Sequence, residues 1–445
     1  MVSDNKEARE FVLHSVKEND VKFIRLWFTD VLGNLKGFAI TVEELKPALE
    51  RGKGFDGSSI GGYVRTDESD MIAMPDPNTF TLLPWRPKKD AVAKMFCDVQ
   101  TPKGEPYESD PRQVLRRNLR RAKDLGYTYS VAPELEFFYF KNNAGTEPLD
   151  QGGYFDQTSL DMGSDMRRET VLTLEQMGIP VEYSHHEVAP SQHEIDLRVT
   201  DALTMADTVM TYRTVVKQIA MKHDVYATFM PKPMYGVNGS AMHTNQSLYR
   251  GDANAFFDPE DPAHLSEVAK QFLAGLLRYA PEITLVTNQW VNSYKRLVPA
   301  MEAPIYVSWA RRNHSDLVRI PDFKPGREDS TRIEYRAPDA ACNPYLAFAV
   351  MLAAGLEGIE RGLTPPPAAE RDLNSLTEEQ RVAQGVVTLP RSLREAINLA
   401  EKSEVLRKAL GDTVLDGFIR NKKLEWEDYR SRVHEYELKR YLPIM

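Results

Sequence analysis

The sequence has few of the features that mark secreted, membrane-spanning or nucleic-acid-binding proteins. Its 2 cysteines, Cys97 and Cys342, form no CxxC pattern, which excludes a disulfide framework and favours a reducing, cytoplasmic setting. No apolar run reaches about 18 residues and the N-terminal stretch is charged, so we expect neither a transmembrane helix nor a signal peptide. The formal net charge of −9 argues against nucleic acid and anionic membranes as partners.

Common nucleotide-binding and catalytic motifs are also missing. The chain contains no GxxxxGKS/T phosphate loop, no GxGxxG after a strand and no GxSxG nucleophile elbow. Any nucleotide must therefore be held by another architecture. What is present is a chain of 445 residues with 42% hydrophobic content, which suffices for a large core and suggests two domains.

Apolar alternation predicts a small, mainly β N-terminal domain. Residues 23–41 are predicted to form two strands around a tight turn, and residues 41–44 a capping box that opens a short helix. The polar stretch 98–109 contains two prolines and is the best candidate for a boundary. We therefore expect domains at 1–105 and 106–445.

The larger domain is predicted to alternate strands with long helices, expected among other places at 165–178, 201–223 and 262–280. Its first helix carries a cluster of four arginines, Arg116, Arg117, Arg120 and Arg121. A solvated helix face is favoured over a phosphate site, because most charge clusters of this kind are solvated. The C-terminal part is expected to be helical and charged.

Acidic residues placed inside apolar strands are the most informative feature. Glu134 and Glu136 lie two apart in APELEFFYF and share a strand face. Glu187 and Glu194 are seven apart, but the Pro190-Ser191 interruption allows a bulge or turn that resets the parity. In TRIEYRA, Glu334 shares a face with two arginines. A single such glutamate is usually solvated; the repetition in several strands favours a common site.

Converging carboxylates need cations, and oxygen-rich sites with one imidazole suit Mg²⁺ or Mn²⁺ better than Zn²⁺. The imidazole is expected from NGSAMHTNQS, where His243, Asn245 and Ser247 share one strand face. Two metals held by carboxylates indicate phosphate chemistry. Arginines supply candidate anion sites, with surface salt bridges as the alternative: Arg296, Arg311, Arg312, Arg319, Arg332 and Arg336.

Taken together, nine motifs in order along essentially the whole chain resemble type I glutamine synthetase, and GGYVRTDESDM is similar to its shorter alpha subgroup. The motifs are GFDGSSI (54–60), DPNTFTLLPW (76–85), PELEFF (133–138), HHEVAPSQHEID (185–196), NGSAMHTNQS (238–247), NQWVNSYKRLVP (288–299), EAP (302–304), RIEYR (332–336) and NPYLAFAVMLAAGLEGI (343–359).

The resemblance implies an α+β fold: an N-terminal β-grasp domain and a glutamine synthetase/guanido kinase-like catalytic domain of antiparallel strands with helices. It implies a dodecamer of two hexameric rings with active sites between subunits. The implied activity is the ATP-dependent ligation of ammonia to the γ-carboxylate of L-glutamate through γ-glutamyl phosphate, giving glutamine, ADP and phosphate. Two or more Mg²⁺ or Mn²⁺ ions per site are implied as cofactors.

The resemblance also implies roles for individual residues. The implied ligands of the first metal are Glu136, Glu187 and Glu194, and those of the second are Glu134, His243 and Glu334. Implied glutamate contacts are Asn238, Gly239, Arg296 and Arg336. Implied nucleotide contacts are Glu182, Asn245, Ser247, His314 and the phosphate-binding Arg319. The implied ammonium pocket consists of Asp56 from the adjacent subunit with Ser59, Tyr154 and Glu187, and Glu302 is the implied flap residue.

Some positions depart from the usual family pattern. The family usually has glycine where this chain has Ser191 and Ala241, histidine where it has Asn245, and glycine-tyrosine where it has Ala300-Met301. At His314 the family usually has an arginine that contacts ATP. The neighbouring Arg312 could substitute for that arginine. These changes leave open a γ-glutamyl ligase that uses a polyamine or small alkylamine. A non-catalytic relative is a third alternative, although all six implied metal ligands are present.

Overall fold

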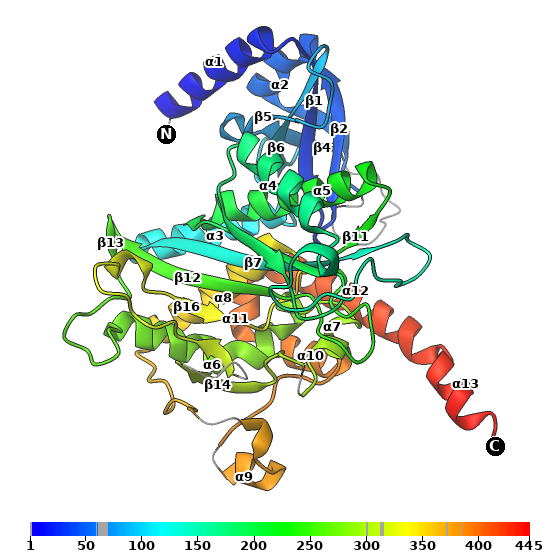
Figure 1. The fold of residues 1–445 in the computed structure, drawn as a ribbon. Coiled ribbons are helices and arrows are strands. Elements are labelled where there is room, and N and C mark those ends of the chain that lie inside the picture. Colours follow the sequence, from blue (N-terminus) through cyan, green and yellow to red (C-terminus); the bar gives the residue numbers. More distant parts are fainter. Residues whose placement is uncertain are drawn as a thin grey trace.

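The structure, a computed structural model, describes residues 2–58, 60, 70–299, 301–311, 316–370, 373–383 and 385–445. Ser59, Ala300, Arg312 and His314, which carry predictions above, lie outside the described residues. The described chain folds around two sheets, the smaller above the larger in the view of Figure 1. Among the described helices, none is long and apolar enough to cross a membrane.

The smaller sheet is built from the N-terminal part of the chain and has the order β2-β1-β6-β4-β3, with β5 paired to β6. Its strands are β1 (Val21–Thr29), β2 (Leu35–Thr41), β3 (Lys53–Asp56), β4 (Asp70–Pro75), β5 (Thr81–Leu82) and β6 (Ala91–Gln100). β1 and β6 run parallel, whereas the other pairs are antiparallel. Helices α1 (Val2–Glu18) and α2 (Leu45–Arg51) complete a small hydrophobic core with β1 and β6.

The predicted capping box at residues 41–44 is wrong in detail. Thr41 precedes a short 3₁₀ turn, Val42–Glu44, and its side chain makes no capping hydrogen bond. α2 begins only at Leu45. Thr41 is itself the last residue of β2, so its extended backbone belongs to the sheet pairing.

The larger sheet has the order β14-β15-β16-β12-β7-β9-β8, with β10 and β11 paired to β7 and β13 paired to β12. Its strands are β7 (Thr128–Phe140), β8 (Val181–His186), β9 (Gln192–Leu197), β10 (Thr200–Asp201), β11 (Tyr226–Thr228), β12 (Met242–Arg250), β13 (Ala253–Asn254), β14 (Tyr306–Ala310), β15 (Asp316–Arg319) and β16 (Ile333–Tyr335). All described pairs are antiparallel except β14 with β15. The predicted α+β class is thus confirmed.

The remaining helices belong to the part of the chain that forms the larger sheet. They are α3 (Pro111–Asp124), α4 (Ser164–Gln176), α5 (Ala202–Lys222), α6 (Glu267–Thr287), α7 (Ser293–Arg296), α8 (Pro344–Glu360), α9 (Glu378–Ala383), α10 (Leu393–Ala400), α11 (Glu404–Leu410), α12 (Asp412–Ser431) and α13 (Glu435–Tyr441). The helix predicted at 262–280 lies several residues later, as α6. Ser266 sets its start by accepting a hydrogen bond from the Ala269 amide.

Each central strand divides its side chains between two faces. β7 places Val131, Leu135 and Phe137 in the main hydrophobic core, and its alternate residues Glu134 and Glu136 therefore point to the opposite face. The same division applies to β9, β12 and β16, whose core residues include Ile195, Met242 and Ile333. The period-two pattern therefore collects the strand carboxylates on one face of the larger sheet.

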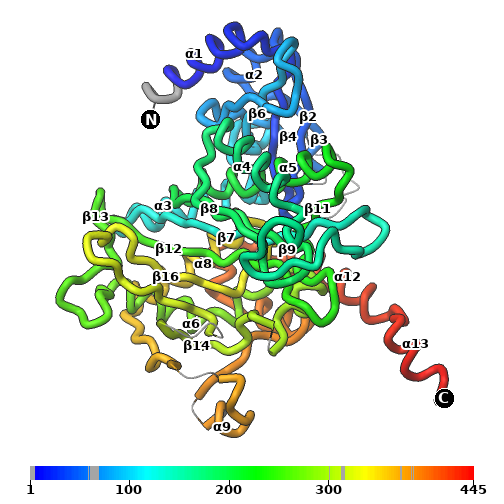
Figure 2. Tube along the Cα trace, in the orientation of Figure 1, coloured from blue at the N-terminus to red at the C-terminus, as the bar shows by residue number. Residues whose placement is uncertain are grey.

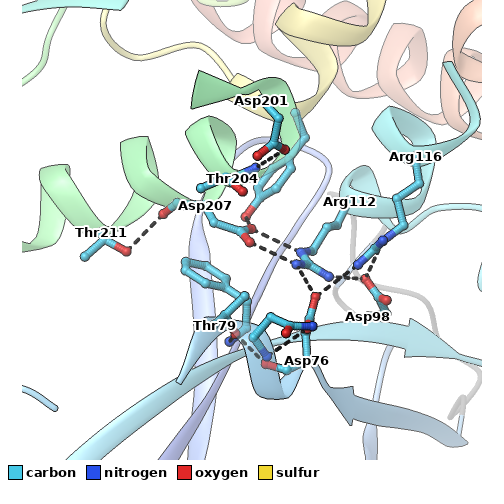
Figure 3. Close-up of polar contacts among 12 residues, drawn as sticks. Asp76, Thr79, Asp98, Arg112, Arg116, Asp201, Thr204, Asp207 and Thr211 are labelled. Carbon is cyan, nitrogen blue, oxygen red and sulfur yellow. Dashed lines mark hydrogen bonds and ion pairs between the residues drawn. The ribbon is translucent and has the colours of Figure 1, made fainter. Parts of the chain in front are cut away.

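A buried ion-pair network joins the two sheets through α3 (Figure 3). Arg112 donates hydrogen bonds from Nε and from both outer nitrogens of its guanidinium group. Two of these bonds, of 3.1 and 2.9 Å, go to Asp207 of α5, and the others go to Asp98 and Asp76. Arg116 contacts the same two N-terminal carboxylates from a more exposed position. Arginine at the centre of three carboxylates fixes how α3 sits against both sheets.

The expected solvated face of α3 is therefore wrong for most of its arginines. Arg117 donates to the Leu410 carbonyl, and Arg121 pairs with Glu357 and Glu360 of α8. Arg120 is exposed. These partners come from the C-terminal part of the chain, and they attach α3 to the helices that cover the sheet.

The C-terminal end leaves the body of the molecule. α13 projects beyond α12 in Figure 1, and the trace in Figure 2 ends away from both sheets. Val433, Tyr436, Leu442 and Ile444 are each at least 69% exposed. Several large apolar side chains exposed in one short segment are a common feature of protein–protein interaction sites.

Candidate active site

Three pairings across the larger sheet bring its carboxylates together. In β7 and β9, Glu134 lies opposite Asp196, and Glu136 lies opposite Glu194. On the other side of β7, Glu134 faces His243 of β12. β16 then places Glu334 beside Asn245. Because these residues share one sheet face, they form a continuous acidic row that includes the imidazole of His243.

The first cluster consists of Glu134, His243 and Glu334. One ligand atom from each lies within 4.8 Å of the others. The Nδ1 atom of His243 lies 3.5 Å from Glu134 Oε2 and 3.9 Å from Glu334 Oε1. Burial, together with the charge of Arg336, holds the pKa of His243 well below its usual value, so its imidazole is neutral and able to act as a ligand.

The second cluster lies at the hairpin between β8 and β9. The chain turns at residues 187–191, as the Pro190-Ser191 interruption predicted, and this turn brings Glu187 back beside Glu194. His185 Nε2 lies 2.9 Å from Glu187 Oε1 and 3.9 Å from Glu194 Oε1. Burial raises the pKa of Glu194 well above its usual value, and neighbouring carboxylates raise it further.

Glu136 lies between the two clusters and is held in place by two neutral donors. Its Oε2 atom accepts hydrogen bonds of 2.9 Å from Gln192 Nε2 and from the Ala241 amide. Burial, with the charge of Glu187, raises the pKa of Glu136 to about 8. Because the Ala241 contact uses only the backbone, the alanine that replaces the usual glycine keeps it.

The donor set fits divalent metal ions. Both clusters are rich in carboxylate oxygen with one imidazole each, a donor chemistry suited to Mg²⁺ or Mn²⁺. His243 Nε2 is buried and has no hydrogen-bond partner among the described residues, so the imidazole is not committed to another group on that side. Added positive charge would also relieve the repulsion that raises the pKa values of Glu136 and Glu194.

Arginines flank the acidic row. Arg319 and Arg336 contact the two oxygens of Glu334 at 2.7 and 2.9 Å. Arg296 is 2% exposed and donates to the carbonyls of Ala337 and Arg336 rather than to a carboxylate. Burial lowers the pKa of Arg296, but the guanidinium group remains a cation.

Gly239 lies in close contact with this arginine group. A Cβ atom at Gly239 would lie 2.1 Å from the Pro231 carbonyl oxygen and 3.3 Å from Arg296 Cγ. Only glycine therefore lets the backbone of residues 238–240 pass between Pro231 and Arg296. The predicted glutamate contacts Asn238, Gly239 and Arg296 thus belong to one region, with Arg336 beside Glu334.

Tyr154 and Glu302 lie on two loops near the acidic row. Burial raises the pKa of Tyr154, and the charges of Glu187, Glu194 and Glu302 raise it further. The Tyr154 ring packs edge-on against His185 of the hairpin cluster, at 5.4 Å. Glu302 accepts a 2.6 Å hydrogen bond from Asn238 Nδ2. Asp56 lies elsewhere, at the end of β3 in the smaller sheet, where it accepts hydrogen bonds from Ser58.

The predicted nucleotide contacts extend along β12 and β8. Asn245 donates to Glu134 Oε1 and accepts from Arg332 Nε, which links the amide to both the metal cluster and an arginine. Ser247 donates to the Thr331 carbonyl, and Glu182 is exposed on β8. Arg311 lies apart from the acidic row and contacts Asp322.

The sequence predictions gave no role to three residues of this site. His185 joins the hairpin cluster, Asp196 lies opposite Glu134, and Gln192 bridges Glu136 Oε2 and the Gly239 carbonyl. Burial, together with the charge of Glu134, raises the pKa of Asp196 to about 8. Asp196 follows Glu194 by two residues, so period-two alternation was a signal that could have identified it.

Family models match both parts of the chain. The model described as "Glutamine synthetase, beta-Grasp domain" matches residues 20–102, and the one described as "Glutamine synthetase, catalytic domain" matches residues 108–441. The chain belongs to the glutamine synthetase family and is a ligase, which confirms the resemblance seen in the motifs.

Individual relatives agree over nearly full length. Glutamine synthetase of Mycolicibacterium smegmatis is 55% identical over 442 residues, which cover 98% of this chain and 99% of the relative. That of Methanosarcina mazei is 50% identical over 98% of both chains. A solved structure, "GmaS/ADP complex-Conformation 1", superimposes with a TM-score of 0.88 at 32% identity, covering 97% of this chain and 99% of that one.

Proposed function

We propose that this chain ligates ammonia to the γ-carboxylate of L-glutamate at the expense of ATP, through γ-glutamyl phosphate, with glutamine, ADP and phosphate as products. The observation that carries the proposal is the acidic row on one sheet face, where two clusters of potential metal ligands lie beside arginines. The near full-length relatives named glutamine synthetase support the same activity.

Two divalent ions, Mg²⁺ or Mn²⁺, are proposed cofactors. Glu136, Glu187 and Glu194 would hold one, and Glu134, His243 and Glu334 the other. When bound, such ions neutralise phosphate oxygens and the charge that develops during phosphoryl transfer. His185 lies close enough to Glu187 and Glu194 to fix the orientation of these carboxylates, as an outer partner of a ligand does.

The arginines orient the two anionic substrates. Arg296 and Arg336, with the backbone of Asn238 and Gly239, would bind the carboxylates of glutamate. Arg319, 31% exposed at the edge of the row, would contact the ATP phosphates while retaining its bond to Glu334. Glu182, Asn245 and Ser247 would contact the rest of the nucleotide, and His314 is a further proposed contact. With these contacts, the γ-carboxylate and the γ-phosphate would meet on the same sheet face.

The amine is proposed to enter on the Tyr154 side. Tyr154, Glu187 and Ser59, with Asp56 of an adjacent subunit, would bind ammonium, and the carboxylate of Asp56 would accept its proton. Neutral ammonia then attacks the acyl phosphate. Glu302 would close the site against water, because an acyl phosphate hydrolyses when water reaches it. Glu302 would also take the proton that the nitrogen loses as the amide forms.

Assembly is part of the same proposal. Asp56 lies in the smaller sheet and the acidic row lies on the larger one, and we propose that a second copy of the chain supplies Asp56 to the site. The exposed apolar end of α13 supports an oligomer, for which a dodecamer is proposed. We propose the domain division at 1–105 and 106–445 and a cytoplasmic setting, which the two free cysteines favour.

The test is a steady-state assay of the purified protein with ATP, glutamate, ammonium and Mg²⁺ or Mn²⁺. Glutamine and phosphate should form in equal amounts, and phosphate release should require both glutamate and an amine. Phosphate release that is independent of glutamate would contradict the proposal. Absence of turnover with either metal would favour a non-catalytic relative.

A further inference from the structure

A third buried cluster lies behind the hairpin that carries Glu187. It contains Asp150, His186 and His193, whose nitrogen and oxygen atoms lie within 4.8 Å of one another. Asp150 belongs to the connection between β7 and α4, and the two histidines belong to β8 and β9. The cluster thus joins the loop of Tyr154 to the hairpin of Glu187.

Asp150 organises the loop backbone. Its Oδ1 atom accepts from the Ser191 amide at 2.9 Å and from the Gly152 amide at 3.3 Å, and its Oδ2 atom accepts from the Met162 amide at 3.1 Å. Burial alone would raise the pKa of Asp150, but the hydrogen bonds from His186 and Ser191 outweigh it and hold the pKa at about 2. The buried group is therefore a carboxylate that needs a cation.

His186 supplies that cation. Its Nε2 atom lies 3.0 Å from Asp150 Oδ1, and its Nδ1 atom lies 2.6 Å from the carbonyl oxygen of Glu187. Both partners only accept hydrogen bonds, so both ring nitrogens carry a proton and the ring is an imidazolium. With no lone pair free, His186 cannot ligate a metal, and the cluster is an ion pair rather than a third metal site.

The contacts of His193 also argue against a third metal site. Its Nδ1 atom lies 2.8 Å from an outer nitrogen of Arg167, which donates to it, and Arg167 makes a two-pronged pair with Asp161. Asp161 ends the loop, so a second buried ion pair fastens its far end. Arginine beside His193 also repels a metal cation.

Between these two anchors, the loop presents its aromatic residues to the second cluster of the active site. The ring of Tyr154 stacks on Phe155 at 4.0 Å, and both rings pack edge-on against His185, at 5.4 and 4.9 Å. His185 in turn contacts Glu187. Asp150 and His186 themselves are 1% and 0% exposed and do not reach the active-site face.

We propose that the Asp150–His186 ion pair is a positioning device for the amine end of the site: it fixes the loop that carries Tyr154 and so holds Tyr154 in place. The inference rests on the proposed function, because it assumes that Tyr154 faces the amine. The ion pair should therefore affect the binding of ammonium and not the binding of glutamate or ATP.

Gly152, which lies between Asp150 and Tyr154 in the loop, fits this role. A Cβ atom at Gly152 would lie 2.7 Å from His186 Nε2 and 2.3 Å from the Leu160 carbonyl oxygen. Any side chain here would push the loop away from the imidazolium. The close approach of the backbone is what lets Asp150 contact both His186 and the amides around it.

The test is a double-mutant cycle with Asp150→Asn and Tyr154→Ala, each assayed for the KM of all three substrates in the full-length protein. Asp150→Asn should raise the KM for ammonium about tenfold and leave the KM values for glutamate and ATP within about twofold. In the Tyr154→Ala background, the same substitution should change the ammonium KM by less than about twofold, because the pair acts through Tyr154.

Asp261→Asn is the matched control. Asp261 also orders a loop by accepting backbone amides, from Ala263 and Leu265, and pairs with a cation, Lys270. It should leave the ammonium KM unchanged. If Asp150→Asn does not give folded protein, His186→Gln, which removes the charge and the second donor, is used in its place with the same expectation.

The outcomes separate the two proposals. If Tyr154→Ala raises the ammonium KM and Asp150→Asn does not, the positioning role alone is overturned. If the two effects are fully additive, the pair does not act through Tyr154 and the role is again overturned. If Tyr154→Ala leaves the ammonium KM unchanged, both the amine pocket and the positioning role fail.

Discussion

The side-chain amide of Asn238 donates a 2.6 Å hydrogen bond to the carboxylate of Glu302. Residue 302 has a left-handed backbone, with φ of 47°, which is uncommon outside glycine and asparagine. The bond holds Glu302 over the segment that leads into β12, next to the proposed glutamate contacts. The carboxylate of Glu302 thus lies beside Asn238, one of the proposed glutamate contacts.

Glu302→Ala should uncouple the reaction. Without the carboxylate, water reaches the acyl phosphate and the last proton has no acceptor, so phosphate release should exceed glutamine formation several-fold. The measurement is the ratio of phosphate to glutamine at saturating ammonium. Glu328→Ala, at an exposed position of the 3₁₀ turn Glu328–Ser330, should keep this ratio at one, and a ratio of one in Glu302→Ala would exclude the lid role.

His243→Ala should weaken metal binding. Loss of a direct ligand is expected to raise the Mn²⁺ concentration for half-maximal activity by about 10- to 100-fold or more. His223→Ala serves as control, because His223 also contacts a glutamate, Glu169, but at an exposed helix end. Equal metal dependence of the two variants would remove His243 from the metal site.

Arg112→Met should destabilise the junction between the two sheets. The substitution leaves Asp76, Asp98 and Asp207 without their shared partner, and breaking such a buried pair typically costs about 3–5 kcal/mol. Arg116→Met removes a 33% exposed side chain from two of the same carboxylates and should cost less than about 1 kcal/mol. Urea unfolding of both variants compares these values, and similar losses would contradict the central place of Arg112.

Lys94→Met should stabilise the protein near neutral pH. Burial lowers the pKa of Lys94 to about 8, although Asp207 opposes the change. The folded state therefore binds this proton less tightly than the unfolded state does. The free-energy cost of burying the charged Lys94 is thus fully present below pH 8 and disappears as the pH rises toward 10.5. We expect a gain of about 3 kcal/mol at pH 7 that shrinks by pH 10. A gain that grows with pH would show that Lys94 is not disfavoured as a cation.

The acidic row could be predicted because alternation along a strand is a local property. Glu134 and Glu136, or His243 and Asn245, share a face whatever else the chain does. The turn after Glu187 was likewise visible as Pro190-Ser191. Which strand lies beside which was available only from the resemblance, since nothing local pairs β7 with both β9 and β12.

Contacts between distant segments could not be predicted in this way. Arg121 contacts Glu357, which lies 236 residues later in the chain. For a basic helix considered alone, a solvated face was the reasonable expectation. The Asp150–His186 pair spans 36 residues and depends on a loop with no periodic pattern. Asp56 is further removed, because its proposed site belongs to another copy of the chain.

The identity of the amine is tested by comparing kcat/KM for ammonium, methylamine, putrescine and spermine. The reaction is followed by phosphate release, and each γ-glutamyl product is identified by mass. Ammonium should have the highest kcat/KM, and glutamine should be the main product. A large preference for methylamine or a polyamine would contradict this expectation and would assign the chain to γ-glutamyl ligation of that amine.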